Sequence, residues 1–139
     1  MKIRILIARI MIALVTFFNL QCAVIFLLFP SMYASGFELS GIPGQVLVRG
    51  LGILFIMWNV PYVVALVDPI RFRISLYEAV AMQAIGLLGE SILLLTLPIG
   101  HAALQMTANR FIVFDGSGLL LLILAAVLTI RKIPAATPV

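Results

Sequence analysis

Long apolar stretches fill most of this chain, and short segments with proline, glycine or charged residues separate them. The stretches cover residues 5–29, 45–67, 75–97 and 109–130, approximately. Each exceeds the about 20 apolar residues that an α-helix needs to cross the hydrocarbon of a bilayer. Their near-continuous apolar character differs from the alternation of a barrel strand, and hydrocarbon tolerates only helices or closed barrels. The pattern predicts an all-α, polytopic membrane protein: one transmembrane domain over 1–139, folded as an antiparallel four-helix bundle.

Local signals within this pattern predict three further features. Pro61 lacks a backbone N–H, so we expect it to kink the second span after Asn59. The S-x-x-E spacing of residues 75–78 predicts a capping box at the start of the third span. Residues 99–108 predict a short interfacial helix before the fourth span begins.

Composition and charge agree with a bilayer as the solvent. Hydrophobic residues make up 64% of the chain and charged residues 10%, whereas a soluble domain carries about a quarter charged residues. Most of the basic residues lie at the two termini and between the second and third spans: Lys2, Arg4, Arg9, Arg71, Arg73, Arg131 and Lys132. The positive-inside rule then places both termini in the cytoplasm. The basic asymmetry favours a bacterial inner membrane, and Tyr62 and Tyr77 are expected at the inner interface. The net charge of +4 comes with no long basic run, so we expect no nucleic-acid partner.

Polar residues inside the spans are the informative positions, because a mid-membrane charge costs about 2.5–3.5 kcal/mol on insertion scales. Gln83 and Glu90 share one face of the third span with Gly86. Arg49 and Asn59 share one face of the second span with Gly52 and Ile56. Antiparallel packing of these two faces predicts an Arg49–Glu90 ion pair.

The start of the fourth span adds a second pair of ionisable residues. Arg110 and Asp115 lie on the same predicted outer side as Arg49, and Gly116 and Gly118 permit a close helix approach. Two interpretations stay open, a buried network that fixes helix register and a functional pocket reached from the outer leaflet. Trp58 lies too deep for an interfacial belt and serves either packing or a ligand platform. The candidate residues are Arg49, Asn59, Gln83, Glu90, Arg110 and Asp115.

Catalytic and metal signatures do not emerge from the sequence. It contains no H-E-x-x-H, G-x-S-x-G or phosphate-loop motif, and its single cysteine excludes a paired-cysteine site. His101 stands alone in a connection, which disfavours a metal role. We therefore expect a non-enzymatic protein without a metal site, and the sequence names no cofactor.

The layout resembles that of the small four-span DoxX-like membrane proteins. The similar features are a first helix that ends at Pro30, the Arg49-Gly50-Leu51-Gly52 segment at the start of the second, and the four-helix arrangement. Members of that group are associated with quinone-linked complexes, so the resemblance implies an accessory or lipophile-binding protein. Our first expectation is an accessory or structural subunit of a larger membrane complex. The alternative is a binder or proton-linked carrier of a small lipophilic or anionic molecule. The expected partners are the lipid bilayer and other membrane subunits or further copies of the chain; under the alternative, a small lipophilic ligand joins them.

Overall fold

Four stretches of helix that are long and apolar enough to cross a membrane make up most of residues 2–130, which are the residues that the computed structural model describes. They contain 24 to 28 residues each. At 1.5 Å per residue they are about 36–42 Å long, which exceeds the about 30 Å of a hydrocarbon core. The elements are α1 (Lys2–Leu28), α2 (Pro30–Ala34), η1 (Ser35–Phe37), α3 (Gly41–Trp58), α4 (Val60–Val67), α5 (Arg73–Thr96) and α6 (Ala102–Thr129). The all-α, four-span prediction is confirmed.

The second span is broken at Asn59, where α3 ends and α4 begins. Pro61 cannot donate a backbone hydrogen bond, and its ring would clash with the carbonyl four residues earlier. Asn59 lies in the break and its side-chain Nδ2 donates to the carbonyl of Phe55 at 2.7 Å. The predicted kink is therefore confirmed, and it lets the two halves of this span pack against different neighbours.

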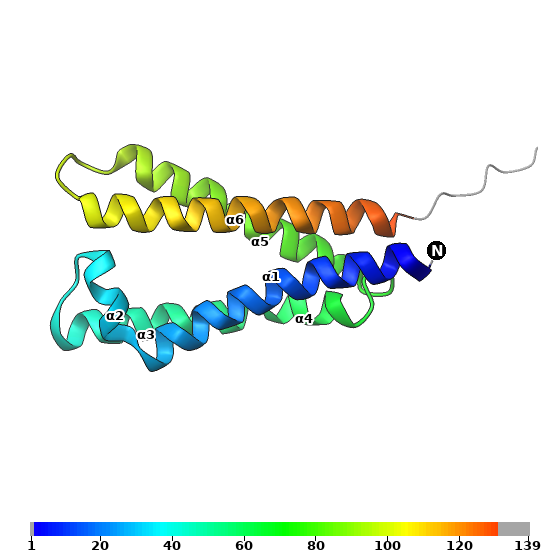
Figure 1. The fold of residues 1–139 in the computed structure, drawn as a ribbon, viewed down its shortest axis with the longest axis horizontal. Helices are drawn as coiled ribbons and strands as arrows, with labels where there is room; N and C mark the ends of the chain where they lie inside the picture. Colours follow the sequence, from blue (N-terminus) through cyan, green and yellow to red (C-terminus); the bar gives the residue numbers. More distant parts are fainter. Residues whose placement is uncertain (1, 131–139) are drawn as a thin grey trace, which may run out of the picture.

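All four spans pack together at the end of the bundle that holds the start of α1 and the end of α6, called here the termini end (Figure 1). Its core is small and aliphatic, with Ile12, Leu76 and Leu122 fully buried beside several alanines. Inside a bilayer no hydrophobic force drives apolar helices together, so their association depends on close packing. Small residues favour this arrangement because they let the helices approach closely. The termini end is thus the closed part of the bundle.

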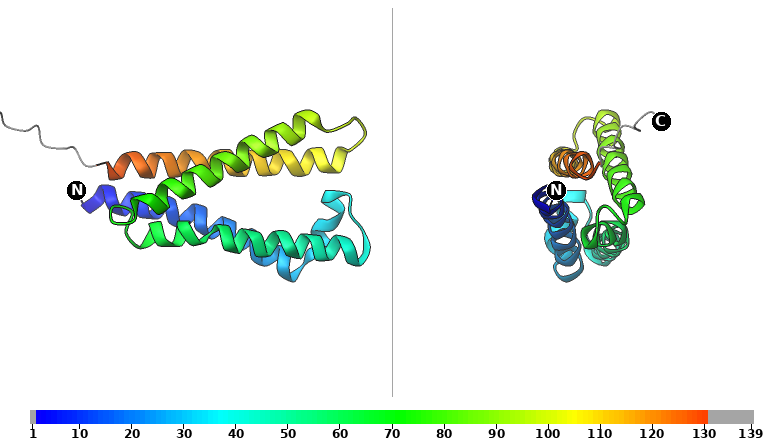
Figure 2. Two further views of the ribbon diagram at one scale, coloured as in Figure 1. Left: turned by 180° about the vertical axis from the view of Figure 1, so that it is seen from behind. Right: turned by 90° about the vertical axis from the view of Figure 1, so that its right-hand side faces the viewer.

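The helices diverge toward the opposite end, called here the far end, where residues 29–40 and 97–101 connect the spans (Figure 2). There α3 packs against α1, whereas α5 packs against α6, and α5 meets the second span through α4. Gly52 allows the α1–α3 contact, because a Cβ atom at this position would lie 2.8 Å from the carbonyl oxygen of Ala23. The far end therefore consists of two helix pairs that are separated on one side.

The segment α2–η1 joins these two pairs across the far end. Thr107 Oγ1 on α6 donates to the carbonyl of Gly36 at 2.7 Å. His101 Nδ1 lies 2.6 Å from Glu38 Oε2, which links the connection before α6 to the connection before α3. These two contacts hold the ends of the separated pairs together.

Two predictions about local structure are wrong. The helix α5 begins at Arg73 and has no side-chain cap, so Ser75 lies inside its first turn instead of capping it. Residues 102–108 belong to the continuous helix α6 instead of a separate interfacial helix. No proline or glycine interrupts the chain between Gly100 and Gly116, and alanine, leucine and glutamine are good helix formers, so the helix continues.

Asp68 orders the turn that leads into α5. Its Oδ1 accepts hydrogen bonds from the backbone N–H groups of Ile70 and Arg71, both at 3.0 Å. The backbone N–H of Arg71 first, then that of Ile70, hold the pKa of the Asp68 carboxyl below its ordinary value. Because these bonds favour the charged form, the turn is most stable when Asp68 is ionised.

The stability contributed by Asp68 is expected to depend on pH. A carboxyl whose folded-state pKa is lowered contributes stability above its unfolded pKa, and this contribution disappears as the pH falls through the folded value. Below about pH 4, the ordinary range of an aspartate, the wild type should therefore lose thermal stability more steeply than Asp68→Asn. Unfolding midpoints in detergent between neutral and acidic pH measure this. Parallel profiles for the two proteins would contradict it.

Candidate functional site

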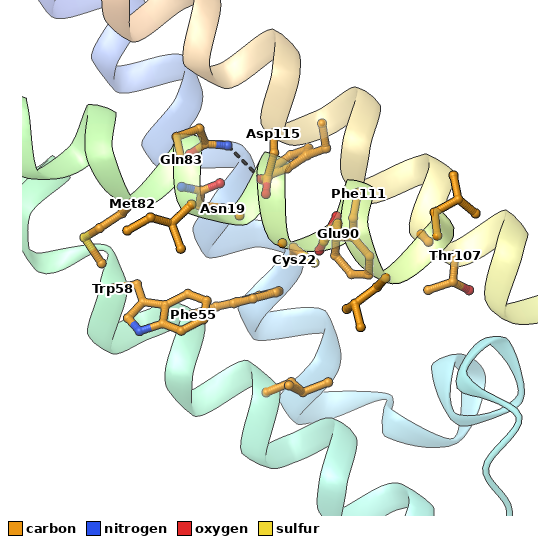
Figure 3. A pocket seen from close by; sticks show the side chains of 18 of the residues that line it. Asn19, Cys22, Phe55, Trp58, Met82, Gln83, Glu90, Thr107, Phe111 and Asp115 are labelled. Carbon is orange, nitrogen blue, oxygen red and sulfur yellow. Dashed lines mark hydrogen bonds between the residues drawn. The ribbon is translucent and has the colours of Figure 1, made fainter. Parts of the chain in front are cut away.

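A cavity of about 650 Å³ lies between the two helix pairs, in the far half of the bundle (Figure 3). Side chains of α1, α3, α4, α5 and α6 line it, together with Phe37 of η1. The break at Asn59 lies beside this space, where α4 packs against both α1 and α5 while α3 packs against α1. Ligand pockets in proteins commonly measure about 300–1,000 Å³, so the cavity can hold a small organic molecule.

Aromatic rings form much of the cavity wall. Phe55 lies 5.8 Å from Trp58 and 6.2 Å from Phe111 between ring centroids, and Phe37 stacks on Phe111 at 6.2 Å. Phe114 also lines the space. Such rings offer large apolar faces with a negative electrostatic potential, which suits a flat or cationic organic ligand.

A chain of hydrogen bonds crosses the base of the cavity and joins α4, α5 and α6. Tyr62 Oη donates to Gln83 Oε1 at 2.7 Å. Gln83 Nε2 in turn donates to Asp115 Oδ1 at 2.8 Å, the bond that is drawn in Figure 3. Gly86 leaves room for the Asp115 carboxylate, because a Cβ atom on Gly86 would overlap this carboxylate. Gln83 and Tyr62 are both 3% exposed, so this chain of hydrogen bonds is part of the core.

Two residues that line the same cavity each have a buried polar atom without any such partner. Glu90 Oε2 and Asn59 Oδ1 are buried and form no hydrogen bond within residues 2–130. Glu90 is half-buried on α5, and its side chain lies near Cys22 and Phe111 (Figure 3). Asn59 is 3% exposed. Because a buried polar group without a partner costs free energy, these two acceptors mark a place where a ligand would add stability.

The cavity opens on the outside of the bundle between α3 and α5. Trp58 of α3 and Ile85 and Leu93 of α5 line the cavity, yet they are 49%, 69% and 65% exposed. Both helices lie within candidate membrane spans. In a bilayer this opening would face acyl chains, so a ligand dissolved in the membrane could reach the cavity sideways.

Four of the six predicted site residues meet at this cavity, namely Asn59, Gln83, Glu90 and Asp115. Arg49 does not. It is exposed, and within the described residues it forms no ion pair with Glu90. The predicted ion pair is wrong because the buried face of α3, namely Gly44, Val48 and Gly52, packs against α1 and α2 instead of α5.

Arg110 lies on a different side of α6. It borders a second hollow of about 440 Å³ between α1, the α2–η1 segment and α6, with Gln21 and Phe18 on the facing helix. Phe37, Phe111, Phe114 and Cys22 line both spaces. Arg110 therefore belongs to a neighbouring surface and not to the cavity that holds Glu90.

Sequence reasoning missed two parts of the site. Tyr62 was expected at a membrane interface, but it is buried and bonded to Gln83. The aromatic wall was not predicted, although Phe55 and Trp58 are one turn apart on α3, and Phe111 and Phe114 are one turn apart on α6. That i, i+3 spacing, next to the polar positions of the same spans, was the available signal.

Comparison with known proteins adds no relative. No protein-family model matches the chain, and no curated protein or solved structure does so either. The architecture itself is that of a small four-span membrane protein whose long helices contact lipid.

Removing the Tyr62 hydroxyl is expected to weaken the bundle modestly. Tyr62→Phe leaves Gln83 Oε1 without its donor. Hydrogen bonds between membrane helices average about 0.6 kcal/mol, with a maximum of about 1.7, so we expect a loss in this range. This loss in the free energy of unfolding is measured by titration with SDS, with circular dichroism as the readout. Tyr77→Phe is the matched control, because Tyr77 is exposed on α5 and its hydroxyl only accepts from Arg73. Equal losses for the two variants would contradict a buried role for Tyr62.

Proposed function

We propose that this protein is a non-enzymatic membrane protein that binds a small lipophilic molecule in the far-end cavity. The observation that carries the proposal is a space of about 650 Å³ with aromatic walls that opens between α3 and α5. Its size, its apolar lining and its few convergent polar groups are the usual properties of ligand sites. The ligand would enter from the bilayer through the side opening.

A purely structural role for the polar residues accounts for only part of the arrangement. The bonds among Tyr62, Gln83 and Asp115 suffice to fix the register of three helices. Glu90 and the free oxygen of Asn59 contribute nothing to that network. A half-buried carboxylate at this depth costs free energy, and residues of this kind in membrane spans usually serve a pathway or a ligand.

The lining of the cavity also bears on the choice between a lipophilic and an anionic ligand. An anionic ligand is disfavoured, since no lysine, arginine or histidine of residues 2–130 lines the space. A subunit role in a larger complex and proton-linked transport stay predictions of the sequence.

We further propose, from the basic asymmetry, a bacterial inner membrane with both termini in the cytoplasm. The DoxX-like resemblance is compatible with a lipophile binder. Its Arg49–Gly52 segment, however, lies two turns inside a helix that begins at Gly41.

Trp58 provides the test, because it is the single tryptophan of the chain and borders the cavity. Titration with 9-(hydroxymethyl)anthracene, a neutral aromatic alcohol, should quench Trp58 emission in dodecyl maltoside with a saturable profile. Saturation separates a site from simple partition of the probe into the micelle.

The matched control moves the tryptophan to the lipid surface. A double variant with Trp58→Phe and Phe17→Trp places the only indole at a position on α1 that is 61% exposed and does not border the cavity. This variant should show quenching that rises linearly with probe concentration. Linear quenching of the wild type, equal to that of the double variant, would refute the proposed function.

A further inference from the structure

The charges and hydrogen-bonding groups of the cavity specify the chemistry of its ligand. We infer that the cavity selects a lipophilic cation, namely an aromatic or alkyl molecule with a protonated amine that Glu90 binds. This inference rests on the proposed function and goes one step beyond it. It follows from three features of the lining, which are its charge, its free acceptors and its rings.

The first feature is a pair of carboxyl groups that have no cationic partner. Glu90 and Asp115 both line the cavity, and among the residues that the structure describes the lining includes no lysine, arginine or histidine. Neither carboxylate forms an ion pair within residues 2–130. Carboxyl groups inside a membrane span usually pair with an opposite charge, and a bound cation would supply that charge here.

The second feature is the kind of hydrogen-bonding atom that is left over. Both buried side-chain atoms without a partner in the described part of the chain are acceptor oxygens, Asn59 Oδ1 and Glu90 Oε2. Asn59 is an observation independent of the carboxylates, since its side chain is 97% buried and borders the cavity. An ammonium group carries three donors and no acceptor, so it complements a site with free acceptors. A ligand whose polar group only accepts would leave both oxygens unsatisfied.

The third feature is the aromatic wall that surrounds these acceptors. Phe55 and Phe111 lie 6.2 Å apart by ring centroids, and both line the same cavity as Glu90 (Figure 3). Ring faces attract cations, most strongly where water is excluded. The same rings bind the apolar part of the ligand. The site therefore combines a cation-binding group with a lipophilic pocket.

The two carboxylates have different roles in this proposal because they have different hydrogen-bond partners. Asp115 already accepts a hydrogen bond from Gln83, and Gly86 is packed against it. Glu90 has no such engagement through Oε2. Glu90 is thus the ligand-binding carboxylate, and Asp115 adds negative potential from across the cavity.

Two probes of nearly equal size test the inference. The first is 9-(aminomethyl)anthracene, a cation at neutral pH, and the second is its neutral alcohol analogue, 9-(hydroxymethyl)anthracene. Both are titrated against Trp58 emission in dodecyl maltoside, a nonionic detergent that does not concentrate cations. Charge-assisted hydrogen bonds are stronger than neutral ones, so we expect the wild type to bind the cation about tenfold more tightly or better.

The variants assign this preference to Glu90. Glu90→Gln keeps the shape of the side chain, so the ratio of the two affinities, and not either affinity alone, is the readout. The preference of this variant for the cation should fall to about threefold or less. Glu78→Gln is the matched control, because Glu78 is exposed on the same helix and does not border the cavity. It should keep the full preference.

The outcomes separate this inference from the proposed function. Equal affinity of the wild type for the two probes would overturn the cation inference and leave the binding function standing. A cation preference that survives Glu90→Gln would also overturn it. Absence of saturable quenching by either probe would overturn both proposals. Because the wild-type comparison needs no variant, a folding defect in Glu90→Gln cannot hide the answer.

Discussion

Gly52→Ala is expected to lower the free energy of unfolding by about 1–3 kcal/mol, the usual cost of overpacking a well-packed contact. The added methyl carbon would lie 2.8 Å from the carbonyl oxygen of Ala23, 3.1 Å from Leu27 Cγ and 3.2 Å from Phe26 Cβ. The nearest of these atoms belongs to the backbone of α1 and cannot move aside by a rotamer change. The α1–α3 pair would have to separate, which removes one wall of the cavity.

Gly50→Ala is the control for this prediction. Gly50 lies on the same helix, and a Cβ atom there meets nothing within 4 Å. This variant should be neutral, or more stable by up to about 1 kcal/mol, because alanine favours a helix over glycine. SDS titrations of both variants, followed by circular dichroism, provide the measurement. If Gly52→Ala were as stable as Gly50→Ala, the close α1–α3 contact would be wrong.

Gly89→Phe is expected to weaken binding of the neutral anthracene probe at least tenfold, a loss of about 1.4 kcal/mol or more. Gly89 lines the cavity on α5, one turn before Leu93 at the side opening. A Cβ atom at Gly89 meets no atom within 4 Å, so the ring would occupy open space without straining the helix. The variant should fold normally while its new side chain takes the place of the ligand.

Gly50→Phe provides the matched comparison for the blocked cavity. It adds the same ring at another glycine with open surroundings, at a position that does not border the cavity. Trp58 quenching should then saturate as in the wild type. Undiminished binding by Gly89→Phe, with binding by Gly50→Phe intact, would show that the probe binds elsewhere.

The sequence was a good guide to features that depend on local chemistry. Runs of apolar residues determine where a bilayer-spanning helix can lie, and Pro61 breaks its helix regardless of tertiary context. The cost of polar groups in hydrocarbon also identified Glu90, Gln83, Asn59 and Asp115, four residues that share the cavity.

The pairing of these residues depended on geometry that no local pattern contains. The Arg49–Glu90 prediction assumed that the whole second span packs against the third. The break at Asn59 divides that span, so that α3 follows α1 and only α4 contacts α5. Small residues favour this arrangement, because on the buried face of α3 Gly52 fits closely against α1 and Gly44 fits closely against Leu39 and Ala34. Arg49, next to this face, is therefore exposed.

The aromatic wall lay beyond sequence reasoning for a similar reason. Phe37, Phe55 and Phe111 come from three separate elements. Their ring centroids come within about 6 Å of one another only in the folded bundle. In an apolar span a phenylalanine is also the expected residue on any face, so its identity carries no signal. Tyr62 was misplaced because tyrosine suits both an interface and a buried hydrogen bond.

Native mass spectrometry of the protein, extracted from its membrane in mild detergent, tests the central claim most directly, because it records what the cavity holds. The account predicts a small-molecule adduct on the wild type that carries an amine and is lost on collisional activation. The adduct should persist on Gly50→Phe and be absent from Gly89→Phe. A wild-type chain without any adduct, or an adduct of equal occupancy on Gly89→Phe, would contradict the claim that this cavity binds a lipophilic ligand.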